Sequence, residues 1–154
     1  MRKHIQHPLA TVALIGALAL ARAAHADPCK LEITGNDVMQ YDKSELAVPA
    51  TCKEITLTLH HSGKQPKTVM GHNWVLVKAA DFNAVAQAGV GAGLANNYVV
   101  PGDKRVLAHT KVVGAGETTS VTFPSSILVK GGDYRYLCTY PGHYALMHGV
   151  FKFG

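Results

Sequence analysis

The 154-residue chain is poor in charged residues, aromatic residues and cysteines. Charged residues make up 16% of it, aromatic residues 7%, and there are three cysteines. The basic residues are scattered rather than clustered, which argues against a nucleic-acid-binding surface. The sequence also has no internal repeat and no low-complexity segment, so its composition favours an ordinary globular domain.

The longest apolar segment is too short to cross a membrane. It spans residues 9–21, whereas a membrane-spanning helix needs about 20 apolar residues. The basic start before it and the Ala24-His25-Ala26 sequence after it are typical of a secretory signal peptide. We therefore expect residues 1–26 to be removed by cleavage after Ala26. The mature protein is then a single domain of residues 27–154 without a membrane anchor.

Removal of the leader changes the charge of the protein. The leader holds three basic residues and no acidic one, so the mature chain carries twelve basic and ten acidic residues, a net charge of +2. A mature chain of 128 residues is long enough to bury a substantial core. The small net charge gives no further support to a nucleic-acid partner.

Three cysteines in an exported chain imply one disulfide and one cysteine left over. Cys29 and Cys52 flank the first two strand-like segments and are the natural pair. Cys138 is then the unpaired thiol. An exposed thiol is a liability in an oxidising compartment, whereas a buried or metal-bound thiol is not.

Alternation of polar and apolar residues predicts a protein made mostly of strands. In the segment 53–60 this alternation places Ile55, Leu57 and Leu59 on one face. Residues 79–94 are rich in alanine and predict a short helix in a long insertion, fraying at its glycines. The predicted strands are residues 30–34, 53–60, 74–77, 105–112, 118–123, 134–138 and 149–153. Seven to eight short strands indicate an all-β, antiparallel Greek-key β-sandwich with one helical insertion. Trp74 is expected in its core.

The predicted strand at residues 134–138 leads into a loop rich in soft metal ligands. Cys138, His143 and Met147 lie within ten residues, and Pro141-Gly142 between them predicts a chain reversal. The reversal allows the Cys138 and His143 side chains to face one centre. His72, far upstream, can complete the site. Two histidines, one cysteine and a weak methionine are the ligand set of a blue-copper electron-transfer centre.

The neighbours of His72 suit the same site. Gly71 has no side chain, so its backbone can come close to a metal and its carbonyl can serve as a weak axial contact. The amide of Asn73 can tie the two ligand-bearing loops together by hydrogen bonds and orient the thiolate.

These residues resemble the azurin group of the cupredoxin, or blue-copper, family over the whole mature chain. The matching segments are residues 35–37, 69–76, 105–111, 120–123 and 138–147. The resemblance implies that Cys138, His72 and His143 are equatorial copper ligands, Met147 a long axial ligand and the Gly71 carbonyl a distant one. It also implies one-electron transfer in the periplasm, with c-type cytochromes and copper nitrite reductase as typical partners.

The chain departs from the family pattern beside the copper loop. Tyr140 stands where the family usually has phenylalanine, and Tyr144 where it usually has serine. Both changes can affect solvent access or hydrogen bonding near the thiolate. Their effect on the site is left open by the sequence.

We expect His143 to be the electron port, because a ligand on a loop can have its ring edge near solvent. An apolar patch around it is the expected docking surface for redox partners, with the mature protein a monomer. The patch comprises Met39, Val69, Met70, Val90, Tyr140, Pro141, Ala145 and Leu146.

Two other kinds of function are alternatives to electron transfer. The first is a copper carrier or store, or a zinc protein. Methionine is a poor zinc ligand, and a carrier normally needs an easily exchanged site rather than one built into a rigid core. The second is a copper enzyme, which requires an open coordination position and a substrate pocket. The sequence shows no second copper motif and no acid–base pair, so we expect no enzymatic activity.

Overall fold

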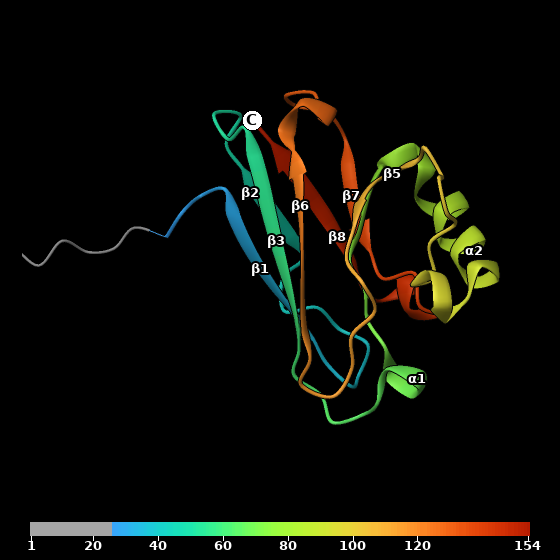
Figure 1. The fold of residues 1–154 in the computed structure, drawn as a ribbon. Helices are drawn as coiled ribbons and strands as arrows, with labels where there is room; N and C mark the ends of the chain where they lie inside the picture. Colours follow the sequence, from blue (N-terminus) through green and yellow to red (C-terminus); the bar gives the residue numbers. More distant parts are fainter. Residues whose placement is uncertain (1–25) are drawn as a thin grey trace, which may run out of the picture.

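Eight strands in two sheets form the framework of the computed structural model, which describes residues 26–154 (Figure 1). One sheet has three strands in the order β1-β3-β6, and the other has five in the order β2-β8-β7-β4-β5. The strands are β1 (Lys30–Gly35), β2 (Glu45–Val48), β3 (Glu54–His61), β4 (Val75–Lys78), β5 (Val106–His109), β6 (Thr118–Pro124), β7 (Tyr134–Leu137) and β8 (His148–Phe153). The predicted β-sandwich is confirmed.

The sandwich is mixed rather than wholly antiparallel. β1 pairs with β3 in parallel, and β2 pairs with β8 in parallel, while the other four pairings are antiparallel. The prediction of an antiparallel sandwich is therefore wrong for these two pairs. Between β1 and β3 the chain crosses to the other sheet to form β2, so β1 and β3 enter their sheet in the same direction. The alternation of polar and apolar residues along β1 and β3 cannot reveal this connection, because it shows only which face of each strand is buried.

The strands differ from the predictions by more than one residue in two places. β2 was not predicted, because four residues give only two alternations. The strand expected over residues 105–112 is only Val106–His109. Beyond His109 the chain lies beside the segment that carries His72. The Thr110 hydroxyl accepts a hydrogen bond from Trp74 N, and the backbone of Val113 pairs with that of His72.

The core lies between the two sheets. Ile55, Leu57 and Leu59 of β3 are fully buried on one face, as the alternation predicted. Trp74 is fully buried at the centre, as predicted. Its ring centroid lies 6.1 to 6.2 Å from those of three further aromatic rings, which belong to Phe123, Tyr136 and Phe151.

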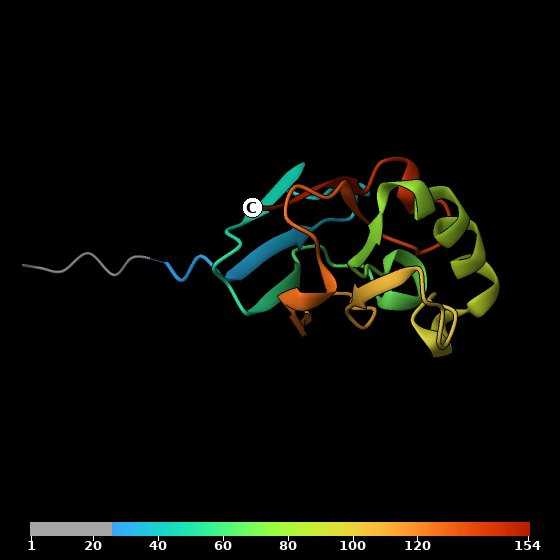
Figure 2. The ribbon, with the colours of Figure 1, turned by 90° about the horizontal axis from the view of Figure 1, so that it is seen from above.

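The predicted helical insertion is confirmed and covers the outer face of the five-stranded sheet. Helix α2 (Phe82–Ala92) follows the 3-10 turn η1 (Ala79–Asp81) and precedes η2 (Leu94–Asn96). In α2, Val85 and Ala86 pack with Val75 and Val77 of β4, and Figures 1 and 2 show α2 at one side of the sandwich. β4 is therefore buried on both faces, which explains its unbroken apolar sequence.

The remaining elements are short. A single helical turn, α1 (Lys67–Met70), was not predicted and precedes His72. Two further 3-10 turns are η3 (Ser125–Ile127), after β6, and η4 (His143–Ala145), between β7 and β8. In Figure 1, α1 lies at the end of the sandwich opposite the C-terminus.

The cysteines behave as predicted. Cys29 and Cys52 form a disulfide, and Cys138 is free and buried. The predicted leader lies outside the described residues, apart from Ala26. Among residues 26–154, no helix is long and apolar enough to cross a membrane.

Candidate metal centre

The loop after β7 folds back on itself as its Pro-Gly turn predicted. Gly142 adopts a positive φ of 82°, which glycine tolerates without strain. His143 N donates to the Tyr140 carbonyl across 3.0 Å, which closes the turn. At the base of the loop, Cys138 N donates to the Met147 carbonyl at 2.9 Å. The two ends of the ligand-rich segment are therefore held side by side.

Cys138 owes its direction to the strand before it. Tyr134 and Tyr136 of β7 point into the core, whereas Leu137 points to the opposite face and packs with the α2 side of the sheet. Because alternate residues of a strand share a face, Cys138 continues the inward series. Its side chain is fully buried.

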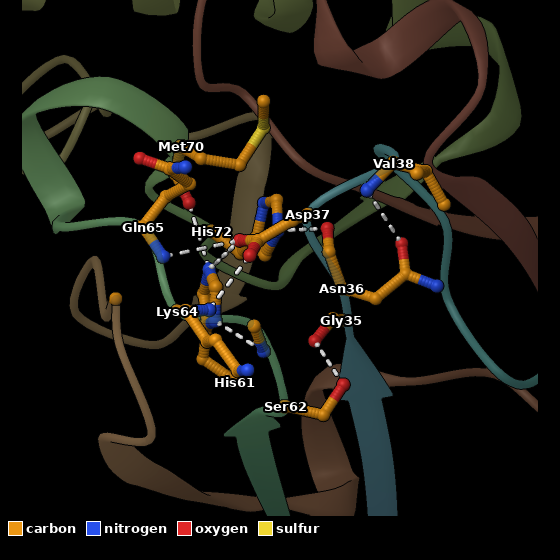
Figure 3. Close-up of polar contacts among 12 residues, drawn as sticks. Gly35, Asn36, Asp37, Val38, His61, Ser62, Lys64, Gln65, Met70 and His72 are labelled. Atoms are coloured by element: carbon orange, nitrogen blue, oxygen red, sulfur yellow. Dashed lines mark hydrogen bonds and ion pairs between the residues drawn. The ribbon is translucent and has the colours of Figure 1, made fainter.

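His72 enters the same space from the segment before β4. Its backbone pairs with Val113, with His72 N donating to the Val113 carbonyl at 2.9 Å. Its ring Nε2 lies 2.8 Å from the Asn36 carbonyl (Figure 3). Because a carbonyl only accepts, this contact assigns the proton to Nε2 and leaves the Nδ1 lone pair free for a metal.

Three donor atoms from these segments converge. The Nδ1 atoms of His72 and His143 are 3.3 Å apart, and Cys138 Sγ lies 3.7 Å from His143 Nδ1. All three donors lie within 4.8 Å of one another, and none of the three residues is more than 3% exposed. Such a compact set of two imidazoles and one thiol is suited to hold a single soft or borderline metal ion.

Burial sets the protonation of this group. Desolvation lowers the pKa of both His72 and His143 to about 4, so both rings are neutral near pH 7 and available as ligands. Desolvation raises the pKa of Cys138 to about 12, against the effect of nearby backbone N–H groups of Asn73 and Tyr140. A thiolate at this position therefore requires a positive charge beside it, which a bound metal ion supplies.

The Asn73 side chain joins the two ligand-bearing segments. Its Oδ1 accepts from Thr139 N at 2.9 Å, and its Nδ2 donates to Thr139 Oγ1 at 2.8 Å. Nδ2 also donates to the Asn97 carbonyl at 2.7 Å. Asn73 is fully buried, so these contacts lie out of water.

Met147 and Gly71 lie in the surroundings of this group. Met147 is fully buried and packs in one cluster with Cys138, and a Cβ on Gly35 would lie 3.2 Å from its methyl group and 2.8 Å from the His72 ring. A Cβ on Gly71 would lie 2.5 Å from the Lys67 carbonyl and 2.9 Å from the Tyr140 ring. Gly71 therefore permits close packing of the backbone against the ligand loop. Their roles as axial ligands stay predictions.

Several residues around the site were not assigned a role by the sequence. The His61 ring stacks on that of His72, with centroids 4.5 Å apart and planes 12° apart. The Tyr41 hydroxyl donates to the Asn73 carbonyl, and Tyr41 packs against the cluster that contains Cys138. His61 continues the buried alternation of β3, a signal that predicts its inward direction. Tyr41 follows a turn and carries no comparable signal.

The two tyrosines that depart from the family pattern make different contacts. The Tyr140 ring lies 4.6 Å from the His143 ring and packs edge-on against Tyr98. Tyr144 meets Phe82 of α2 edge-on at 6.4 Å. Tyr140 thus supports a candidate ligand directly, whereas Tyr144 links the ligand loop to the helix.

Five of the eight residues of the predicted docking patch are exposed. Val69, Val90 and Leu146 are 57%, 47% and 60% exposed. Pro141 and Ala145 are also exposed, and Met39 and Met70 are partly buried. Tyr140 is only 8% exposed, so it lies behind the patch and contributes little to its surface. Val38, which was not predicted, is 63% exposed.

A β-sandwich with a buried Cys-His-His group defines a single-copper protein of the cupredoxin type. The family model described as copper-binding proteins, plastocyanin/azurin family, matches residues 27–153. The chain belongs to this family. It is accordingly a copper protein of the electron-transfer kind, with one copper as its cofactor, and not an enzyme.

The relatives it matches are azurins. Azurin-1 of Alcaligenes xylosoxydans xylosoxydans is 56% identical over 124 residues, 80% of this chain and 96% of that protein. Azurin of Bordetella pertussis is 50% identical over 143 residues, 90% of this chain and 95% of that protein. The solved structure of azurin iso-2 from Methylomonas sp. strain J superimposes with a TM-score of 0.79 at 49% identity, over 82% of this chain and 98% of that one.

The lowered pKa values of the ligand histidines predict how the metal-free protein responds to acid. Both imidazoles have a pKa of about 4 when folded and an ordinary value of 6.5. Between these values the unfolded chain binds more protons, so the free energy of unfolding falls as the pH falls from 6.5 to 4. Urea unfolding of the metal-free protein across this range measures it. His143→Gln removes one of the two groups and is expected to lose about half of the pH dependence; an unchanged dependence would contradict the assignment.

Proposed function

We propose that this chain is exported to the periplasm, after cleavage behind Ala26, as a one-electron carrier with a type 1 (blue) copper site. The observation that carries the proposal is the convergence of His72 Nδ1, Cys138 Sγ and His143 Nδ1 within 4.8 Å in a buried space. Imidazoles together with a thiol match the preferences of copper. Membership of the plastocyanin/azurin family supports the same assignment.

In this proposal a copper ion would be held by His72, Cys138 and His143, with Met147 as a weaker ligand and the Gly71 carbonyl as a more distant contact. Burial of Met147 beside Cys138 supports its place in this set. A copper ion held there supplies one-electron chemistry by cycling between Cu(I) and Cu(II).

The protein's own residues keep this site rigid and dry. Near-complete burial of the donors excludes water, so no position is left for a substrate. The Asn36 carbonyl fixes the His72 ring, and the Asn73 amide fixes the backbone beside Cys138. Because these bonds and the pairing of His72 with Val113 hold the backbone beside the donors, little rearrangement would be required when the charge changes.

The exposed apolar patch is the proposed docking surface. His143 is the electron port, since its loop lies between exposed Pro141 and Leu146. An exposed apolar patch of this kind is suited to brief, non-obligate contacts. The proposed partners are redox proteins such as c-type cytochromes and copper nitrite reductase, met by a monomer.

The copper assignment is tested by adding Cu(II) to the purified mature chain. We expect an intense blue colour from charge transfer between the Cys138 thiolate and copper, with one copper bound per chain. Cys138→Ala is expected to abolish the colour, because no other described cysteine is free. A wild-type protein that binds copper but stays colourless would overturn the blue-copper assignment.

The docking patch is tested by placing a charge within it. Met70→Lys is expected to slow electron exchange between oxidised and reduced copies of the protein roughly tenfold, because one important docking contact is lost. The absorption spectrum of the copper site is expected to stay unchanged. NMR line broadening in mixtures of the two forms measures this rate.

Val129→Lys is the matched control for this test. Val129 is 70% exposed and lies in the segment after η3. Its carbonyl accepts from Gly132 N, and the neighbouring Gly131 N donates to the carbonyl of Phe153, next to the C-terminus. Equal rates in Met70→Lys, Val129→Lys and the wild type would remove the patch from the account.

A further inference from the structure

We propose that Asp37 is a positioning residue for His72. Its carboxylate fastens the loop after β1 to the loop after β3, and this clasp holds the Asn36 carbonyl against His72 Nε2 (Figure 3). The inference rests on the proposed copper function, because the effect is exerted on a copper ligand.

The clasp consists of hydrogen bonds from backbone to carboxylate. Lys64 N donates to Asp37 Oδ2 at 2.6 Å, and Gln65 N donates to Oδ1 at 3.4 Å. These two donors belong to the segment that follows β3, whereas Asp37 follows β1. The Lys64 N–H is the largest influence lowering the pKa of Asp37, so the carboxylate is ionised and the bonds are charge-assisted.

On the β1 side, the clasp holds residues 36–40, which form a turn closed by their own hydrogen bonds. Asn36 Oδ1 accepts from Val38 N at 3.0 Å and from Gln40 N at 3.1 Å. Asn36 N donates to the Gln40 carbonyl at 3.2 Å. This turn fixes the local shape of the loop. Its place against the segment after β3 is set by the Asp37 carboxylate together with Ser62, whose N and Oγ donate to the Gly35 carbonyl at 2.9 and 3.2 Å. The Asn36 carbonyl is thereby presented to His72.

On the β3 side, the same segment supports the face of the His72 ring. Gly63 N donates to His61 Nδ1 at 3.0 Å, and His61 Nε2 lies 2.8 Å from the Met70 carbonyl. His61 stacks directly on His72. Asp37 therefore connects the two supports of the His72 ring, namely the carbonyl at its edge and the imidazole at its face.

Close packing of Gly63 gives a second way to open the clasp. A Cβ on Gly63 would lie 2.0 Å from Asp37 Oδ1 and 2.3 Å from its Cγ. Gly63→Ala therefore forces the carboxylate away from its donors without removing its charge. Asp37→Asn does the opposite, because it removes the charge and keeps a side-chain acceptor. Asp37→Ala removes both.

These three variants separate the position of His72 from the charge of Asp37. In the metal-free protein, NMR follows exchange of the His72 Nε2 proton with water. In the copper-loaded protein, electron paramagnetic resonance and the charge-transfer band report the copper–ligand geometry. The reduction potential, measured at low and high salt, reports the charge.

We expect Asp37→Ala and Gly63→Ala to speed exchange of the His72 Nε2 proton by roughly fivefold or more, the effect of one hydrogen bond, and to alter the copper spectra. Asp37→Asn is expected to keep the wild-type spectra. It raises the reduction potential slightly at low salt, because a negative charge near the cation is lost, and salt screens this effect.

Matched controls exist for both kinds of change. Asp42→Ala also removes a carboxylate that accepts a backbone N–H, that of Thr34 at 2.8 Å. Gly91→Ala adds a methyl group where nothing lies within 4 Å. Both are expected to leave the His72 proton and the copper spectra unchanged.

Wild-type proton exchange and wild-type spectra in Asp37→Ala would overturn the proposal, even if Gly63→Ala failed to fold. The two proposals fail separately. A wild-type protein without a blue site would refute the copper function, whereas the metal-free NMR comparison still decides whether Asp37 positions His72.

Discussion

The structure depends on one constraint: donor atoms from distant parts of the chain must meet in a small space that water does not enter. His72 and Cys138 belong to different loops, and their meeting depends on the buried side chain of Asn73. Its amide bonds Thr139, the residue that follows Cys138, through both its oxygen and its nitrogen. Buried amides of this kind are costly unless they are fully paired, so their pairing fixes one relative position of the two loops.

The rest of the sandwich provides the rigid support that this meeting requires. The alternation of side chains along β7 directs Cys138 into the core. The chain leaves β5 after His109, and Val113 in the segment that follows pairs with the backbone of His72. Helix α2 covers the outer face of β4 and reaches the loop that carries Asn97. Each support acts on the backbone beside a ligand rather than on the ligand alone.

Much of this arrangement could be predicted from the sequence, for identifiable reasons. The Cys29–Cys52 pair, the inward face of β3 and the ligand loop each depend on local spacing or composition. The parallel pairing of β1 with β3, the short strand β2 and the clasp at Asp37 do not, because they depend on which segments meet in space. Tyr140 illustrates the limit: its identity was noted from the sequence, but its burial against His143 required the fold.

The central claim is that the protein holds the three donors in one arrangement that serves both oxidation states. X-ray absorption at the copper edge of the Cu(II) and Cu(I) forms tests it most directly. The account predicts two nitrogen ligands and one short sulfur ligand in both forms, with bond lengths nearly unchanged. Loss of a nitrogen ligand on reduction, or a large change in the copper–sulfur distance, would contradict it.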